Sequence, residues 1–230
     1  MATTGAPALA TTSAGIAWSL GLPDGGGLGR EEALASLARI VGVAGGTPVS
    51  ADLEDGYGDS PAETAASVAA ALELGVVGVN LEDGRRSPEQ FAAHLAAVRA
   101  ACGSRVFINA RTDIFLAGAG HSEQLVSEAL RRGRLYLGAG ADGVFVPAAA
   151  SASAIAALAG GLDAPLNVTL SPGGLSPAEL AALGVARISW GSSLAESAYS
   201  VVRDAAAALR GGSAAASPVP LGYAQLNALF

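Results

Sequence analysis

Acidic and basic side chains stand at the ends of three successive apolar segments of the chain. Asp52 and Glu54 end the first segment, Glu82 the second and Arg111 the third. Glu54 and Glu82 are 28 residues apart and Glu82 and Arg111 are 29 apart, which is the length of one strand–helix unit. If such units lie side by side in a parallel sheet, these side chains meet at one rim. Three carboxylates there suit Mg²⁺ or Mn²⁺, and a guanidinium suits a substrate carboxylate or phosphoryl group.

The sharpest motif is Asp-Leu-Glu-Asp-Gly-Tyr-Gly-Asp, which begins at Asp52. Alternate residues of a strand face the same side, so Asp52 and Glu54 are expected to point together into the interior. Their mutual repulsion would be relieved by a metal ion; the alternative is a pair of solvated acids at an exposed strand end. Gly56 and Gly58 allow a tight turn or a positive φ. Tyr57 either reaches a substrate with its phenol or packs as a ring.

Other polar residues are candidates for holding the substrate. Arg111 ends an apolar strand candidate, and a buried arginine needs an anionic partner, either one of the acids or a substrate carboxylate. Asp113 is expected to orient it. Asn167, on a later strand candidate, could add neutral hydrogen bonds. Hydroxyl residues with free backbone N–H groups that could cradle an anion end the first strand candidate: Thr11, Thr12 and Ser13.

The two histidines and the single cysteine carry weaker predictions. His94 lies in a helix candidate and is expected at the surface, whereas His121, in a glycine-rich loop, is an acid–base candidate. Cys102 is expected to be a buried structural thiol, and one cysteine excludes an intrachain disulfide or a cysteine-based zinc cluster.

Composition excludes several classes of function. The chain has no lysine, since all 13 basic residues are arginine, so Schiff-base aldolases, covalent pyridoxal phosphate chemistry and Walker-type phosphate loops are excluded. A net charge of −7 argues against nucleic-acid binding, and the arginine clusters at 85–86 and 131–134 are expected to be solvated. The apolar runs are too short or too interrupted to span a membrane, and no signal peptide is recognised, so a cytoplasmic protein is expected.

The elements that must position these residues alternate along the chain, which predicts one large α/β domain with a parallel sheet. The predicted strands are Ala8–Thr12, Pro48–Glu54, Gly78–Glu82, Val106–Arg111, Gly143–Pro147, Leu166–Leu170 and Arg187–Trp190. The predicted helices are Arg30–Ala44, Pro61–Leu74, Pro88–Ala101, Ser122–Gly138, Ser151–Ala159, Ser176–Leu183 and Ser193–Leu209. Three helix candidates begin with a Ser-Pro pair, a strong start signal.

The regular spacing favours a TIM-type (β/α)₈ barrel over an open doubly wound sheet, and no G-x-G-x-x-G follows any strand candidate. Seven strands are predicted where a barrel needs eight, so the first strand and helix of a full barrel are expected to be lacking. Residues 1–211 are expected to form the barrel domain. Residues 212–230 are expected to form a small-residue linker and a short helical tail that caps the barrel or contacts a partner subunit.

Together, several stretches resemble the isocitrate lyase / phosphoenolpyruvate mutase superfamily over residues 7–210. They are ATTSAGIAWSLGLPDG, VSADLEDGYGD, GVNLEDG, INARTD, GADGVFVP and PLNVTLSPG. The resemblance implies a (β/α)₈ barrel, Mg²⁺, small 2-oxo or 2-hydroxy carboxylate substrates, and a homodimer or homotetramer. The family's functional positions fall on Asp52, Glu54 and Glu82 for the metal, on Thr11, Thr12, Ser13, Arg111 and Asn167 for the substrate, and on Asp24, Tyr57 and Arg111 for catalysis.

The chain departs from the lyases of this superfamily in one loop. Their long mobile loop with Lys-Lys-Cys-Gly-His is replaced here by DGRRSPEQF after Glu82, so isocitrate or methylisocitrate lyase activity is not expected. The resemblance implies a Mg²⁺-dependent lyase or hydrolase that cleaves a C–C bond of an oxaloacetate-like acid through an enolate, with Asp24 as a candidate base. The alternatives are a phosphonopyruvate-type C–P enzyme and a 2-oxo acid binding protein with little catalysis.

Overall fold

The structure is a computed structural model that describes residues 5–118, 123–212 and 222–228. The chain divides into two compact units. The larger unit comprises residues 1–11 and 30–189, and the smaller unit comprises residues 12–29 and 190–230.

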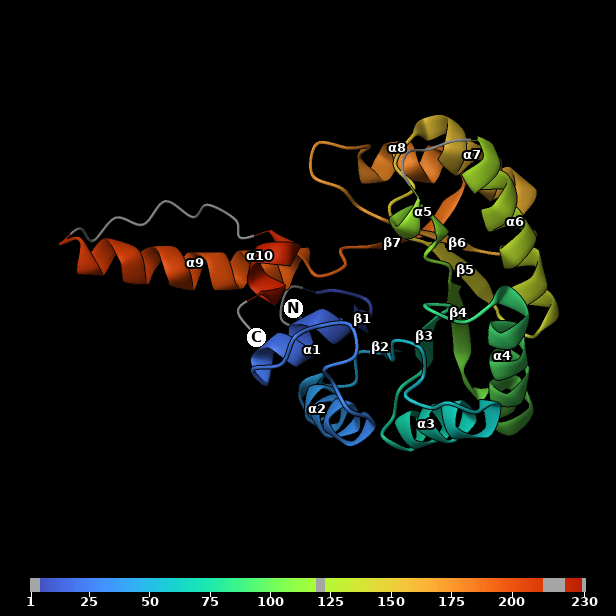
Figure 1. Cartoon of the computed structure of the whole chain (residues 1–230), viewed down its shortest axis with the longest axis horizontal. Helices are drawn as coiled ribbons and strands as arrows, with labels where there is room; N and C mark the ends of the chain where they lie inside the picture. Colours follow the sequence, from blue (N-terminus) through green and yellow to red (C-terminus); the bar gives the residue numbers. More distant parts are fainter. Residues whose placement is uncertain (1–4, 119–122, 213–221, 229–230) are drawn as a thin grey trace. The chain divides into compact units, whose positions relative to one another are not determined.

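The larger unit is built on a curled sheet of seven parallel strands, each hydrogen-bonded to the next in chain order (Figure 1). This arrangement confirms the predicted α/β architecture, a TIM-type barrel that lacks part of its wall. All seven predicted strands are present, with ends shifted by at most two residues. They are β1 (Leu9–Ala10), β2 (Val49–Asp52), β3 (Gly78–Glu82), β4 (Phe107–Arg111), β5 (Gly143–Val146), β6 (Leu166–Thr169) and β7 (Val185–Ser189).

The larger unit also contains helices, most of which cover the convex face of the sheet, with several neighbouring pairs packed against each other (Figure 1). They are α2 (Arg30–Val43), α3 (Pro61–Glu73), α4 (Pro88–Cys102), the 3₁₀ turn η2 (Gly103–Arg105), α5 (Ile114–Ala117), α6 (Glu123–Gly138), α7 (Ala152–Gly161) and α8 (Pro177–Ala182). The Ser-Pro signals are confirmed, because Ser60, Ser87 and Ser176 each cap their helix in a reciprocal capping box. These three helices therefore each begin at a defined residue.

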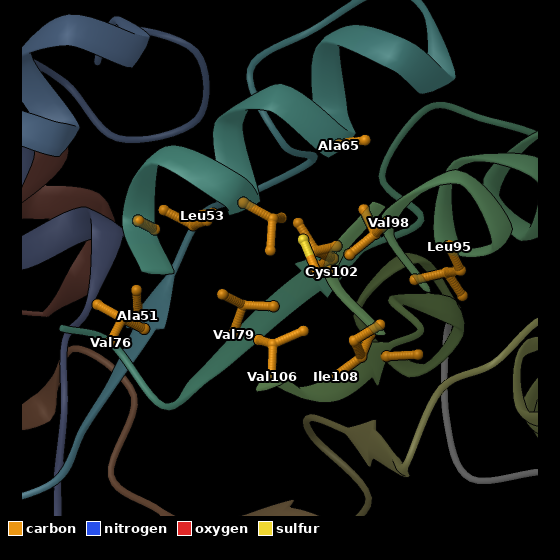
Figure 2. Close-up of a cluster of buried hydrophobic side chains, with 14 of the residues drawn as sticks. Ala51, Leu53, Ala65, Val76, Val79, Leu95, Val98, Cys102, Val106 and Ile108 are labelled. Carbon is orange, nitrogen blue, oxygen red and sulfur yellow. The ribbon is translucent and has the colours of Figure 1, made fainter. Parts of the chain in front are cut away.

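An apolar core between the sheet and the helices fixes which side chains face inward (Figure 2). Val79 and Leu81 of β3 are fully buried in this core. Since strand residues alternate, Asn80 and Glu82 face the concave side of the sheet. Cys102 is free and buried, as predicted.

The smaller unit contains α1 (Ser13–Ser19), α9 (Ser193–Arg210) and α10 (Tyr223–Asn227). Trp18 is 2% exposed and makes an edge-to-face contact with Tyr199 of α9. Its indole N–H donates to Asn227 of α10 over 3.3 Å. Helix α10 lies within the tail for which a short helix was predicted, whereas most of the predicted linker lies outside the described residues. Among the helices of the described residues, none has both the length and the apolar character that crossing a bilayer requires.

Candidate metal and carboxylate site

A row of register partners crosses the concave face of the larger unit near the carboxyl ends of its strands. Glu82 lies opposite Arg111, and Arg111 lies opposite Phe145. The row continues through Asn167 to Arg187. Register partners in a parallel sheet project to the same side. The predicted meeting of Glu82 and Arg111 at one rim therefore follows from the strand pairing, and Asn167, a substrate-binding candidate, lies in the same row.

Arg111 is held between two carboxylates. Its Nη1 lies 2.8 Å from Oε2 of Glu82, while its Nε and Nη2 donate to the two oxygens of Asp113 over 2.6 and 3.1 Å. The guanidinium also lies 6.0 Å from the centre of the Phe145 ring. Pairing with the acids is thus the alternative that the structure shows, and Asp113 orients Arg111 as predicted. The fork is presented on the concave face with its orientation already fixed.

Asp52 and Glu54 approach Glu82 by a different route from the one predicted. Strand β2 ends at Asp52, and Glu54 has a φ of +50°, so strand alternation does not extend to Glu54. Instead, the Glu54 carbonyl accepts a hydrogen bond from the Glu82 amide over 2.9 Å, which places the two residues side by side. The location of Asp52 and Glu54 at the end of β2 agrees with the prediction. The prediction of an extended backbone at Glu54 is wrong.

The crowding of carboxylates perturbs both Glu82 and Tyr57. Burial, together with the charges of Asp113, Asp52 and Glu54, outweighs the Arg111 guanidinium and raises the pKa of Glu82 to about 8. Burial and the carboxylates of Glu54, Asp52 and Glu82 also raise the pKa of Tyr57, whose hydroxyl donates to Glu54 over 3.4 Å. Tyr57 consequently keeps its proton at physiological pH and can act as a hydrogen-bond donor.

The residues fit a metal ion that keeps part of its water shell. Among the described residues, no three acidic, histidine or cysteine side chains form a ready-made metal cage. Mg²⁺ commonly binds through one or two carboxylates, several waters and substrate oxygens, so such a cage is not required. Burial first, and the neighbouring carboxylates after it, raise the pKa of Glu82, and a divalent cation would stabilise the ionised carboxylate there. Asp52, Glu54 and Glu82 remain the residues that would hold it, directly or through water.

The loop that carries Tyr57 is strained and tightly anchored. Tyr57 has a φ of +52°, and Gly56 a φ of +95°. A Cβ atom on Gly56 would lie 2.5 Å from Cγ2 of Thr64. Arg86 donates to the backbone oxygens of Asp55 and Gly58, so the prediction that Arg86 is merely solvated is wrong. A small residue at position 56 and a cation at position 86 therefore shape the loop.

The remaining predicted residues occupy other places. Thr11 belongs to the larger unit, where its hydroxyl accepts a hydrogen bond from the Asp52 amide over 2.9 Å. Thr12, Ser13 and Asp24 belong to the smaller unit. Helix α1 begins at Ser13, where a turn was expected. The Asp24 carboxylate accepts a hydrogen bond from the Tyr223 hydroxyl, and its amide donates to Asn227, both within the smaller unit. Their roles in catalysis and substrate binding stay predictions.

Asn167 is buried and engaged by one neighbour. Its side-chain amide and the hydroxyl of Ser189 exchange hydrogen bonds of 2.8 Å. Arg187 precedes Ser189 by two positions and thus shares its face of β7. Burial lowers the pKa of Arg187, and the Asp52 carboxylate opposes that shift. Sequence reasoning missed Arg187, although an arginine inside a strand was the signal that identified Arg111.

The predictions for the histidines have different outcomes. His94 is 4% exposed, and its Nδ1 lies 2.8 Å from the Thr64 hydroxyl, so the prediction of a surface position is wrong. His121 lies outside the described residues. A surface hollow of about 440 Å³ borders Tyr57 together with Arg30 and Glu63, rather than the Glu82 side of the site.

Comparisons with known proteins agree with this geometry. The family model described as phosphoenolpyruvate phosphomutase matches residues 1–210, so the chain belongs to that family and to the PEP mutase/isocitrate lyase superfamily, as the motifs predicted. An uncharacterized protein of Mycobacterium tuberculosis is 37% identical over 97% of this chain and 84% of its own length. Two solved structures are similar. A candidate phosphonomutase from Burkholderia cenocepacia is 39% identical, with a TM-score of 0.81 over 92% of this chain and 88% of that one. Oxaloacetate acetylhydrolase in complex with oxalate is 26% identical, with a TM-score of 0.78 over 99% and 83%.

Proposed function

We propose that the chain is a Mg²⁺- or Mn²⁺-dependent lyase or hydrolase that cleaves a C–C bond in a small, oxaloacetate-like 2-oxo or 2-hydroxy carboxylate. The observation that carries the proposal is the Arg111 fork, fixed by Asp113 and Glu82 beside the carboxylates of Asp52 and Glu54. The likeness to oxaloacetate acetylhydrolase, a structure holding oxalate, supports this substrate class.

Each protein group has a defined task in such a reaction. Arg111 binds a substrate carboxylate through its planar donors. A divalent ion held by Asp52, Glu54 and Glu82 would supply Lewis-acid polarisation of the 2-oxo acid oxygens. Tyr57, whose pKa is raised, keeps its proton and can donate a hydrogen bond to a substrate oxygen. The base stays the prediction made from the sequence, Asp24, which would deprotonate water or a substrate hydroxyl.

The short connection after β3 supports a different substrate from that of the isocitrate lyases. Only five residues separate Glu82 from Pro88, the first residue of α4. Asp83 at the start of this connection is buried, and Arg86 near its end is anchored to the neighbouring loop. The connection has no lysine, cysteine or histidine that could serve as the lyases' acid.

The proposal is tested with a panel of 2-oxo and 2-hydroxy acids in the presence of Mg²⁺. For oxaloacetate, hydrolysis consumes one water and releases oxalate and acetate, both of which are measured. We expect metal-dependent turnover that falls at least about a hundred-fold in Glu82→Gln. No turnover of any panel member by the wild-type protein, or full turnover by Glu82→Gln, would contradict the proposal.

The likeness to a candidate phosphonomutase favours a second candidate, a C–P enzyme acting on a phosphonopyruvate-type substrate. Phosphonopyruvate therefore belongs in the same panel, with phosphate release as the readout. Binding of 2-oxo acids without conversion would instead identify a binding protein with little catalysis.

A further inference from the structure

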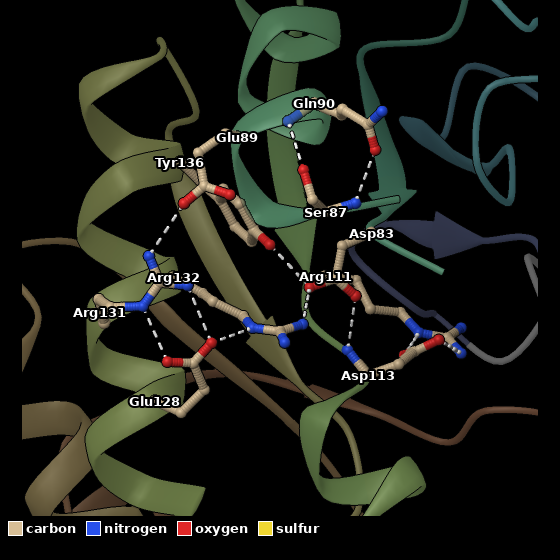
Figure 3. A network of polar contacts seen from close by, with 10 residues as sticks. All are labelled: Asp83, Ser87, Glu89, Gln90, Arg111, Asp113, Glu128, Arg131, Arg132 and Tyr136. Carbon is tan, nitrogen blue, oxygen red and sulfur yellow. Dashed lines mark hydrogen bonds and ion pairs between the residues drawn. The ribbon is translucent and has the colours of Figure 1, made fainter. Parts of the chain in front are cut away.

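A buried carboxylate that does not belong to the metal and substrate residues lies behind them. Asp83 directly follows Glu82, and it is 1% exposed. Its side chain accepts three hydrogen bonds and thereby joins two parts of the larger unit (Figure 3). A buried carboxyl group is costly unless it is paired and hydrogen-bonded, so these partners account for the position of Asp83 in the interior.

Two of the partners come from helix α6. Arg132 donates from Nη1 to Oδ2 of Asp83 over 2.8 Å, and the Tyr136 hydroxyl donates to the same oxygen over 2.7 Å. Arg132 is held in turn by Glu128, whose Oε1 accepts from its Nε over 2.7 Å. Burial and the Asp83 carboxylate raise the pKa of Tyr136, so Tyr136 remains a donor. Helix α6 therefore fixes the orientation of Asp83.

The third partner leads into the candidate site. Oδ1 of Asp83 accepts a hydrogen bond from the backbone N–H of Asp113 over 3.0 Å. The Asp83 amide also donates to the Arg111 carbonyl over 3.1 Å, so Asp83 is hydrogen-bonded to the backbone on both sides of Thr112. The Asp113 side chain then holds the Arg111 fork, and Arg111 holds Glu82. The contacts thus run without a gap from α6 to the guanidinium that faces the substrate.

We infer that Asp83 is a positioning residue for the substrate-binding arginine: paired with Arg132 and Tyr136, it fixes the backbone of Asp113 and so the orientation of the Arg111 fork. The expected effect of Asp83 on turnover rests on the proposed function. Asp83 does not touch the substrate in this account. It acts by keeping Arg111 in the orientation that a bound carboxylate requires, and errors of about 1 Å in such groups can reduce rates by roughly a hundred-fold.

A matched control lies at the amino-terminal end of β4, the strand whose carboxyl-terminal end carries Arg111. Asp142 also pairs with an arginine, Arg99, and accepts a backbone N–H bond from Ile108 of β4 over 2.7 Å. The variant Asp142→Asn therefore disturbs an ion pair and a backbone hydrogen bond of the same kind, away from Arg111. Asp83→Asn is compared with it, and Tyr136→Phe provides a milder change that removes one donor and no charge.

The test combines kinetics with NMR of the arginine Nε–H groups in the full chain. We expect Asp83→Asn to raise KM for the acid that the wild type turns over, and to lower kcat/KM by about ten- to a hundred-fold, while Asp142→Asn stays within about two-fold. Tyr136→Phe should give a smaller change in the same direction. In the ligand-free protein, the Arg111 Nε–H signal should shift or broaden in Asp83→Asn and remain in place in Asp142→Asn.

The outcomes separate this inference from the proposed function. An unchanged Arg111 signal in both Asp83→Asn and Tyr136→Phe would overturn the positioning role, whether or not the protein is active. Equal losses of kcat/KM in Asp83→Asn and Asp142→Asn would also overturn it, because general destabilisation would then explain both. A wild-type protein that turns over no panel acid would refute the proposed function, and the NMR comparison would still decide the role of Asp83.

Discussion

Removing the charge of Arg111 should destabilise the metal-free protein in a pH-dependent way. Arg111 makes contacts of 2.8 Å with Glu82 and of 2.6 and 3.1 Å with Asp113. The three side chains are each only about one-fifth exposed, at 21%, 20% and 21%. Arg111→Met keeps most of the aliphatic stem but leaves two partly buried carboxylates without their counter-ion.

The expected cost follows from this burial. Breaking a buried ion pair by removing one partner typically costs about 3–5 kcal/mol, and the remaining exposure of Arg111 favours the lower end, about 3 kcal/mol. The loss depends on ionisation of Glu82, whose pKa is already raised to about 8 and should rise further without Arg111. When a carboxyl group has a raised pKa in the folded state, the free energy of unfolding falls as the pH rises through that pKa. The loss should therefore be largest above about pH 8 and smallest near pH 5.

Urea unfolding of the wild type and of Arg111→Met, in chelator at several pH values, measures this difference in the free energy of unfolding. Arg131→Met is the matched control, because Arg131 also contacts two acids, Glu128 and Glu89, but its side chain is 50% exposed. Its loss should stay below about 1 kcal/mol. A cost below about 1 kcal/mol for Arg111→Met, or a cost that does not change with pH, would refute the reasoning.

Three further predictions concern other parts of the chain. In the metal-free wild type, the free energy of unfolding should decline between about pH 5 and 8, because Glu82 is forced to ionise. Glu82→Gln should flatten this decline in urea titrations. A steeper decline in the variant would show that ionisation of Glu82 is not its cause. Gly56→Ala should cost more than about 2 kcal/mol, because its φ is +95° and its Cβ would meet Thr64 at 2.5 Å, whereas Gly45→Ala, with open space around it, should cost about 1 kcal/mol by thermal unfolding; equal costs would argue against the steric explanation. Helix α9 exposes Val202 by 67%, so Val202→Asp should shift the expected homodimer or homotetramer toward smaller species in light scattering, and a wild type that is already monomeric would contradict the expected assembly.

The spacing of residues along the chain predicted the part of the site that depends on local order. Alternating strands and helices, with Ser-Pro helix starts, placed Glu82 and Arg111 at neighbouring strand ends, and the register confirms it. Such a prediction works because parallel strands joined by helices must align their carboxyl ends. It needs no knowledge of contacts between distant residues.

The predictions that failed depended on partners far away in the sequence. His94 was expected at the surface because helix position alone gives no sign of Thr64, 30 residues earlier. Asp83 carries no sequence signal of its own, because its partner Arg132 lies 49 residues later. Glu54 lies outside the strand because its backbone is left-handed where the chain turns. The alternation of strand residues in the sequence cannot reveal this conformation.

The proposed function requires a divalent cation and a small carboxylate to bind together between Asp52, Glu82 and Arg111. Anomalous diffraction from crystals grown with Mn²⁺ and oxalate tests this directly. We predict one manganese peak beside the carboxylates of Asp52 and Glu82, bound directly or through water, with the Arg111 guanidinium in contact with the oxalate. A map with no manganese at this position, or with oxalate bound away from Arg111, would contradict it.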